Sequence, residues 1–394
     1  MSTNHVGILF DSRFDNTGDA AMGIVMAKFC EQHDIDFDIV DPLNFNPASY
    51  ALMIIGGGYL IRDPGDEYYD MFRVNGRHIW NAIGVNSQLN LDHLRDYRYI
   101  SVRSQKEKEQ LRGLVQGVKV VPCITTLMQG EPLPEGITVP DGTIAVHLRP
   151  RVVNETNIES LIEELPNHVV MMPFTHYLED KSFMEGLAWE RRDIEFLPKL
   201  SPGQLFTYIG NCKYVISSSL HASIFAMMQN VPFFVYAEEK TQNYFTDRGL
   251  EWHLFKTCEE LKRKIKQLEK GKVIDFSAII KADTAATRRH LDRLKTAIEQ
   301  ALVEQGQSAP SQIIPANKAV FEKLHIKLLT NVIKHRDAVI FTKSKKLHQQ
   351  ARSIVDLENK VKALQNEVRA IKSSKKWLLA QSVVRLAKSL KPFK

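Results

Sequence analysis

Within residues 215–236, the only side chain that can gain or lose a proton near neutrality is His221, which follows the serines Ser217 to Ser219. The residues before the serines, Tyr214-Val-Ile216, favour a β-strand, and residues 222–228 have a helical composition. In open α/β sheets, ligands bind at such strand-to-helix junctions, and a helix N-terminus there favours anions. Ser218, Ser219 and His221 are therefore candidates for an anion-handling site. The alternative is that the serines cap the helix and the histidine is structural.

Two glycine-containing stretches near the start of the chain also follow predicted strands. Residues 15–19 read Asp-Asn-Thr-Gly-Asp after the strand at 6–10, and Gly56 to Gly58 follow the strand at 50–55. Glycine permits tight turns and a close approach of the backbone to a ligand. The pattern is not the GxGxxG dinucleotide fingerprint, and it lacks the lysine of a P-loop. These stretches therefore indicate a ligand-facing backbone without identifying the ligand.

Strands and helices alternate through most of the chain, which predicts parallel sheets with helices on their faces. At 394 residues the chain is longer than one ordinary core allows. Residues 132–142 contain three prolines and two glycines, so we place a linker there. We predict an α/β protein with two Rossmann-like domains, residues 1–131 and 143–305. The second ends in a long helix over residues 284–303.

The composition excludes several classes of protein. The four cysteines are widely spaced and form no CxxC pair, so neither a zinc site nor a disulfide framework is expected, and we predict no metal site. The N-terminus lacks the regions of a signal peptide, and no apolar run approaches the roughly 20 residues of a membrane span. These features predict a cytoplasmic protein.

Charge is distributed unevenly between the body and the tail. Residues 316–394 carry 19 Lys and Arg against 5 Asp and Glu, whereas the remainder carries 33 basic and 41 acidic residues. A basic tail of this kind favours phosphate-bearing partners, either anionic lipid or nucleic acid.

Within that tail, apolar residues recur at alternating spacings of three and four, which is a heptad pattern. These residues are Ile354, Leu357, Val361, Leu364, Val368 and Ile371. Branched residues at the a positions and mostly Leu at d favour a parallel two-stranded coiled coil. We therefore expect a homodimer formed through residues 347–371. The alternative is a single amphipathic helix packed on the body.

The closing segment, residues 375–394, contains six basic residues and no acidic one. Its apolar residues Leu379, Val383, Leu386 and Leu390 share one helical face, with Trp377 near its start. A basic amphipathic helix of this type suits the inner face of an anionic membrane, which would make the protein peripheral to that membrane. Nucleic acid is not expected as a partner, because the body offers no second basic region.

Four segments of the chain form a recognisable combination: residues 15–19, residues 54–60, the Ile-Ser-Val-Arg of residues 100–103, and the block from Ser219 through Val231-Pro232 to Lys240. Taken together, these motifs resemble the polysaccharide pyruvyl transferase family over roughly residues 5–255. The tail lies outside this resemblance and is similar to the basic tails of some bacterial surface-polysaccharide glycosyltransferases.

The resemblance implies two domains of the GT-B type facing a central cleft. It also implies transfer of a pyruvyl group from phosphoenolpyruvate to two hydroxyls of a sugar, which makes a cyclic ketal and releases phosphate. The acceptor is then a surface polysaccharide or its lipid-linked precursor. No cofactor beyond this donor substrate is expected.

The resemblance also assigns roles on the donor side. His221 matches the histidine of the family's Arg-Leu-His triplet and is the candidate general acid. The arginine of that triplet is Ser219 here, and a hydroxyl cannot supply a cationic fork. Arg149 is our candidate for the missing charge, while Lys240 and Arg103 match family positions. Surface salt bridges are the alternative for Arg149 and Lys240, and a structural role is the alternative for Arg103.

On the acceptor side, the resemblance places the glycine-containing stretches along the cleft. The candidates are Asn16, Gly18, Asp19, Gly57 and Gly58. Asp19 has the alternative role of capping its helix. His147 shares a strand face with Arg149 but is equally consistent with a core histidine, so it is not among the predicted site residues.

Two other functions remain open on the sequence. The first is a GT-B glycosyltransferase that uses a nucleotide sugar, because amides, hydroxyls and a helix N-terminus can hold a diphosphate. The second is a non-catalytic scaffold that organises a polysaccharide biosynthesis complex through its coiled coil.

Overall fold

The computed structural model describes residues 5–11, 16–65, 67–176, 180–187, 189–304 and 318–389. Asp15 and residues 390–394, which some of the expectations above concern, lie outside these ranges. The chain divides into two compact units, Met1–Arg336 and Asp337–Lys394. The first unit contains two parallel sheets, and the second is helical.

The first sheet has six parallel strands in the order β2-β1-β3-β4-β5-β6. They are β1 (Val6–Leu9), β2 (Phe37–Val40), β3 (Leu52–Gly56), β4 (Ile79–Ile83), β5 (Tyr99–Val102) and β6 (Lys119–Val120). Strands β1, β3 and β4 are buried along their whole length, as expected for a parallel sheet covered on both faces. The strand order reverses between β1 and β3, since β2 lies on one side of β1 and β3 on the other. Ligands bind at such a switch point, outside the carboxyl ends of the strands.

The second sheet also has six parallel strands, in the order β12-β11-β10-β7-β8-β9. They are β7 (Ile144–His147), β8 (Val169–Met171), β9 (Glu195–Phe196), β10 (Tyr214–Ser217), β11 (Phe233–Tyr236) and β12 (Leu254–Phe255). Here the order reverses between β7 and β10. The predicted α/β class and its two parallel sheets are therefore confirmed.

The helices of the first unit connect these strands. They are α1 (Thr17–Gln32), α2 (Glu67–Asp70), α3 (Gln105–Gln110), α4 (Pro150–Thr156), α5 (Ile158–Glu163), α6 (Asp180–Gly186), α7 (Pro202–Gly210), α8 (Leu220–Met228), α9 (Glu239–Thr246), α10 (Cys258–Glu269) and α11 (Ser277–Glu304). A short 3-10 helix, η3 (Ile124–Leu127), precedes the proline-rich segment 132–142, in which the structure has neither helix nor strand.

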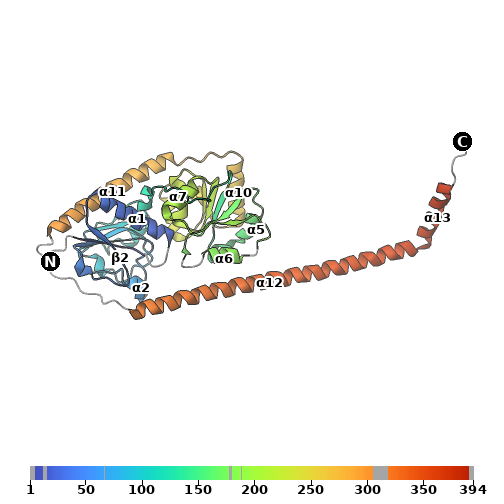
Figure 1. Ribbon diagram of the computed structural model, residues 1–394, viewed down its shortest axis with the longest axis horizontal. Coiled ribbons are helices and arrows are strands. Elements are labelled where there is room, and N and C mark those ends of the chain that lie inside the picture. Colours follow the sequence, from blue (N-terminus) through green and yellow to red (C-terminus); the bar gives the residue numbers. More distant parts are fainter. Residues whose placement is uncertain are drawn as a thin grey trace. The chain divides into compact units, whose positions relative to one another are not determined.

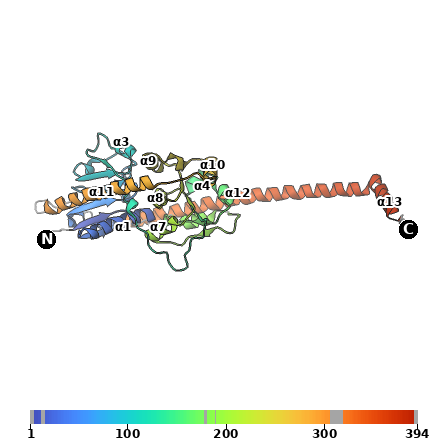
Figure 2. The ribbon, with the colours of Figure 1, turned by 90° about the horizontal axis from the view of Figure 1, so that it is seen from above.

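Helix α11 joins the two halves of the first unit. Just before it, the ring of Phe276 lies 5.5 Å from that of Phe233 in the second sheet. Further along, His290 Nε2 lies 2.7 Å from the Asn81 side-chain oxygen in β4. The long helix expected within residues 143–305 is therefore present, and it runs back along the first sheet (Figures 1 and 2). One cluster of buried apolar side chains likewise includes Val6 of the first sheet and Val215 of the second.

The second unit contains the end of α12 (Lys318–Ser373) and α13 (Lys375–Ser389), drawn in red and orange in Figure 1. The expected helical tail is present, and its heptad residues are exposed along α12. The coiled coil and the membrane contact stay predictions. None of the helices that the structure describes is long and apolar enough to cross a membrane.

Candidate active site

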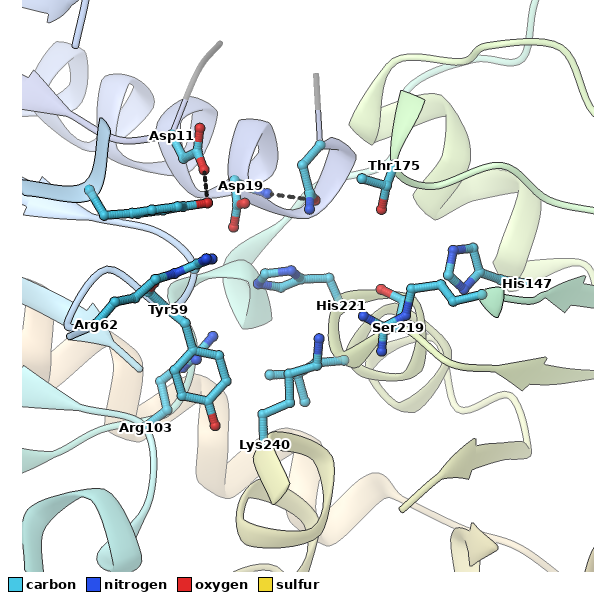
Figure 3. A pocket seen from close by; sticks show the side chains of 15 residues that line it. Asp11, Asp19, Tyr59, Arg62, Arg103, His147, Thr175, Ser219, His221 and Lys240 are labelled. Atoms are coloured by element: carbon cyan, nitrogen blue, oxygen red, sulfur yellow. Dashed lines mark hydrogen bonds between the residues drawn. The ribbon is translucent and has the colours of Figure 1, made fainter. Parts of the chain in front are cut away.

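A cavity of about 180 Å³ lies where the switch points of the two sheets face each other (Figure 3). Asp11 follows β1 and Gly58 follows β3, while Arg149 follows β7 and Ser219 follows β10. Both halves of the unit line the cavity: Asp11, Asn16, Asp19, Gly58, Tyr59, Arg62, Tyr69 and Arg103 from the first, and His147, Arg149, Thr175, Ser219, Leu220, His221 and Lys240 from the second. The parallel topology therefore brings together residues that are far apart in the sequence.

Most of the residues predicted from the sequence lie in this cavity. Those that line it are Asn16, Asp19, Gly58, Arg103, Arg149, Ser219, His221 and Lys240. Gly18, Gly57 and Ser218 do not line it. Gly18 and Ser218 contact lining residues from behind.

The first turn of α1 is held by Asn16, whose side-chain oxygen accepts hydrogen bonds from the amides of Gly18 and Asp19 at 2.9 and 3.4 Å. Asn16 is the N-cap, so the capping role considered for Asp19 belongs to Asn16. The amide of Thr17 donates to the Phe174 carbonyl at 3.0 Å, which fixes this helix end against the second half. The carboxylate of Asp19 is left to face the cavity.

His221 reaches from the first turn of α8 into the first half of the unit. Ser219 is the N-cap of α8, and its side chain accepts from the amide of Ala222. The imidazole Nε2 lies 3.6 Å from the Cys123 sulfur, and the ring packs against Gly18. A Cβ on residue 18 would lie 1.9 Å from His221 Nδ1, so this approach requires glycine.

The surroundings of His221 keep its ring neutral. Burial lowers the pKa of His221 to about 3, and the positive charges of Arg103 and Lys240 act in the same direction. Near neutral pH the imidazole therefore carries one proton and no charge. An anion bound beside it would oppose those positive charges and raise its pKa.

Arg149, Glu238 and Lys240 form a chain of charges on the second half. An Nη of Arg149 donates to the Ser218 carbonyl at 2.8 Å and also to Glu238, so its guanidinium is fixed directly beside Ser219. The Lys240 amine lies 3.6 Å from the other carboxylate oxygen of Glu238. Burial, together with the charge of Arg149, lowers the pKa of Lys240 to about 7. Lys240 thus titrates near neutrality, and Arg149 is the permanently charged partner.

Arg103 points into the cavity from the end of β5, and its side chain is only 4% exposed. Its guanidinium lies 5.4 Å from the centre of the Tyr59 ring and 3.9 Å from Glu107, and its buried Nε has no hydrogen-bond partner. A Cβ on residue 84 would lie 2.1 Å from Arg103 Nη2, so Gly84 makes room for this cation. The Nε of Arg149 is likewise buried without a partner. Both arginines therefore keep unused donors in or beside the cavity.

Two buried carboxyls, Asp11 and Asp19, line the first half of the cavity. The hydroxyl of Tyr68 donates to Asp11 at 2.6 Å. Burial and the neighbouring Asp19 raise the pKa of Asp11 to about 7. Burial raises the pKa of Asp19 to about 6, although Arg103, Lys240 and Arg62 oppose that shift. Both groups can exchange a proton near neutral pH.

Within the described ranges no group of three His, Cys, Asp or Glu side chains is placed to hold a metal ion.

His147 and Ser218 form a buried hydrogen-bonded pair at the end of β7. His147 is fully buried, with Nε2 at 3.0 Å from Asp180 and Nδ1 at 3.1 Å from the Ser218 hydroxyl. This network orients the end of β7, from which Arg149 extends.

Sequence reasoning missed several lining residues: Asp11, Tyr59, Arg62, Tyr69, His147, Thr175 and Leu220. His147, left out of the predicted site as consistent with a core histidine, is fully buried and also lines the cavity. Asp11 directly follows the strand of residues 6–10, and Tyr59 and Arg62 follow the glycines, so their positions after strands were available signals. Thr175 gave no such signal. It reaches the cavity because it forms an isolated bridge with Asn16.

Comparison with known proteins identifies the family of this chain. A model of the polysaccharide pyruvyl transferase family matches residues 16–239, which include all but two of the lining residues named above. The two lining residues outside the match are Asp11 and Lys240. The match covers more than half of the chain, and the protein belongs to this family.

Correspondence with individual proteins is more distant. A search of curated proteins finds no match. Among solved structures, a functionally uncharacterised protein from Klebsiella pneumoniae is 14% identical with a TM-score of 0.41 and covers 62% of this chain and 88% of its own. The UDP-GlcNAc 2-epimerase of Methanocaldococcus jannaschii is 11% identical with a TM-score of 0.47, and the match covers 74% of this chain and 99% of the epimerase. The heptosyltransferase WaaC of E. coli is 14% identical with a TM-score of 0.34, covering 67% and 99%.

The contact between Gly18 and His221 predicts a coupled effect on stability. Gly18→Ala forces a methyl group into the imidazole and is expected to cost about 1–3 kcal/mol of unfolding free energy. In a His221→Ala background the ring is gone, so the same substitution should be nearly neutral. Urea unfolding of the two single variants and the double variant measures this coupling. An equal cost in both backgrounds would show that the imidazole is not what residue 18 meets.

The raised pKa of Asp19 predicts a specific pH dependence of stability. Its folded pKa of about 6 lies above the usual Asp pKa of 3.8, so the native state holds the proton more tightly. The wild type should therefore lose stability relative to Asp19→Asn as pH rises from 4 to 7, on the order of 2 kcal/mol. Urea unfolding of both proteins across this range gives the difference directly. A difference that does not change with pH would contradict the raised pKa.

Proposed function

We propose that the protein transfers a pyruvyl group from phosphoenolpyruvate to two hydroxyls of a sugar in a surface polysaccharide or its lipid-linked precursor. The observation that carries this proposal is the cavity itself. It gathers four cationic side chains, Arg62, Arg103, Arg149 and Lys240, around a neutral histidine. The membership of the chain in the pyruvyl transferase family supports the same reaction.

The cavity favours a small and highly charged donor. Phosphoenolpyruvate carries a phosphate and a carboxylate, and guanidinium donors suit both groups. The unpartnered Nε atoms of Arg103 and Arg149 add donor capacity. A volume of about 180 Å³ is below the range of roughly 300–1,000 Å³ typical of drug-sized ligands, and an intact nucleotide sugar belongs to the larger class.

Proton transfer to the donor is assigned to His221. Without a ligand, the His221 imidazole is neutral. A bound phosphate and carboxylate offset the charges of Arg103 and Lys240 and raise the pKa of His221. The imidazolium then gives its proton to the methylene carbon C3, which becomes a methyl group. Positive charge develops at C2, and the first sugar hydroxyl bonds there.

Asp19 takes the proton of the attacking hydroxyl, because it is the buried carboxyl at the start of α1 that titrates near neutrality. The C2–O bond to phosphate then breaks, and the second hydroxyl bonds to C2 and closes the ketal. Of the two hydroxyl protons, one replaces the proton that His221 gave to C3, and the other leaves on hydrogen phosphate. Atoms and charges therefore balance with no further reactant.

Arg149 takes the place of the arginine that this chain lacks at Ser219. Its guanidinium is fixed by the Ser218 carbonyl, one residue from the position concerned. The cation is thus supplied from the end of β7 instead of from the start of α8.

A nucleotide-sugar glycosyltransferase is the second candidate, and the hydroxyl at Ser219 at the start of α8 is the feature that favours it. A non-catalytic scaffold is the third. The scaffold would keep its function in a His221→Ala variant, whereas either enzyme would lose turnover.

Calorimetric titration with phosphoenolpyruvate tests the donor assignment. The wild type should bind at millimolar concentration or better. Arg149→Ala should weaken binding at least tenfold, because it removes the permanent charge beside Ser219. Arg151→Ala is the matched control: this arginine is exposed on α4 and pairs with Glu155, so binding should not change.

A rescue variant sharpens the result. Ser219→Arg introduced into Arg149→Ala restores a guanidinium at the family's own position and should recover part of the lost affinity. No heat at millimolar phosphoenolpyruvate with the wild type would contradict the donor, and a shift in melting temperature with UDP-sugars would then favour the glycosyltransferase. Equal losses in Arg149→Ala and Arg151→Ala would contradict the role of Arg149.

Lys240 predicts how donor binding depends on pH. Its pKa of about 7 means that its charge is lost as pH rises above neutrality, so the dissociation constant for phosphoenolpyruvate should rise by up to tenfold per pH unit between pH 7 and 9. Lys240→Arg keeps its charge and should show a flatter profile. Titrations at four pH values compare the two proteins. Parallel profiles would show that another group causes the dependence.

A further inference from the structure

We propose that the protein forms a parallel homodimer in which two α12 helices pair through residues 347–371. This inference concerns the helical tail and does not depend on pyruvyl transfer.

The first observation is an exposed apolar column on α12. Its six heptad residues are between 47% and 60% exposed: Ile354, Leu357, Val361, Leu364, Val368 and Ile371. Leu347, one heptad before Ile354, is 64% exposed. Scattered exposed apolar residues are normal on a protein surface, but seven in strict register on one helix face are typical of a helix that packs against a partner. A helix of this length gains most of its stability from such packing.

The second observation is the choice of residues within the column. From residue 354 on, the a positions hold β-branched Ile354, Val361 and Val368. The d positions hold Leu357, Leu364 and Ile371, and Leu347 lies at an earlier a position. This distribution favours two parallel strands over three or four. The seam thus fits a second copy of the same helix.

The third observation is the charge that flanks the seam. In a parallel pair, each g residue faces the e residue five positions further along the other chain. Glu367 then faces Lys372, which is an attractive pair made twice. The other pairings, Ser353 with Glu358 and Lys360 with Gln365, place no like charges together. Charge complementarity therefore supports self-association in this register.

Parallel pairing also has a consequence for the end of the tail. Ser374 interrupts α12, and its hydroxyl accepts from the Trp377 amide, so α13 begins as a separately capped helix. In the parallel dimer both copies of α13 leave the seam at the same end. Each copy begins with Lys375 and Lys376, so the dimer concentrates positive charge there.

Light scattering during size-exclusion chromatography of the full chain tests the association. The wild type should elute with twice the chain mass of 45.0 kDa. The double variant Leu357→Lys, Leu364→Lys places charges in the seam and should elute as a monomer. The matched control, Asn359→Lys with Asn366→Lys, adds the same charge at outward f positions and should stay dimeric. A monomeric wild type at tens of micromolar, or a seam variant that keeps the doubled mass, would overturn the proposal.

Cysteine crosslinking tests the orientation without weakening the seam. In a Cys258→Ser background, which removes the cysteine that is not buried, Leu357→Cys places two d-position thiols opposite each other in a parallel pair. Mild oxidation should then give a covalent dimer on a non-reducing gel, whereas Asn359→Cys should not. A doubled mass without crosslinking at residue 357 would mean that the helices pair in another orientation.

Discussion

The packing of His221 against the first turn of α1 is the contact on which the rest of the site depends. The two switch points belong to different sheets, and either alone presents only half of the lining residues. Gly18 lets the imidazole cross into the first half, and the Thr17 amide bonds back to the Phe174 carbonyl. Helix α11 also connects the two halves, through Phe276 just before it on one side and His290 on the other. The halves therefore form one body with a shared core.

The first unit contains buried charged side chains that do not contribute to its stability. Arg103 is almost fully buried, yet its nearest carboxylate, Glu107, is 3.9 Å away and its Nε is unpaired. Asp11 and Asp19 are buried close enough to raise the pKa of Asp11. A buried charged group without enough hydrogen bonds or ion pairs lowers the stability of the fold. Such groups are therefore found mainly where a ligand or a reaction uses them. These buried charges lie at the carboxyl ends of the strands of the first sheet, where ligands bind in folds of this class.

The sequence predicted the two parallel sheets well because buried β-strands and turn residues are local signals. It also predicted the start of α8, where Ser219 caps the helix and His221 lies in its first turn. Non-local features were less accessible. Nothing in the spacing of residues 284–303 shows that this helix returns to the first sheet, since that depends on partners such as Asn81, more than 200 residues earlier. Thr175 enters the site for a similar reason, through its bridge to Asn16.

Ser219 and Arg149 are best understood as one arrangement. Arg149 is held by two partners, the Ser218 carbonyl and Glu238, and Glu238 is shared with Lys240. An arginine at residue 219 would bring another guanidinium against this one, and the repulsion between them would be strong in a partly buried site. A serine there avoids that repulsion and caps α8 instead. Under the proposed function, Arg149 therefore supplies the positive charge beside Ser219, and a second guanidinium at residue 219 would be repelled by it.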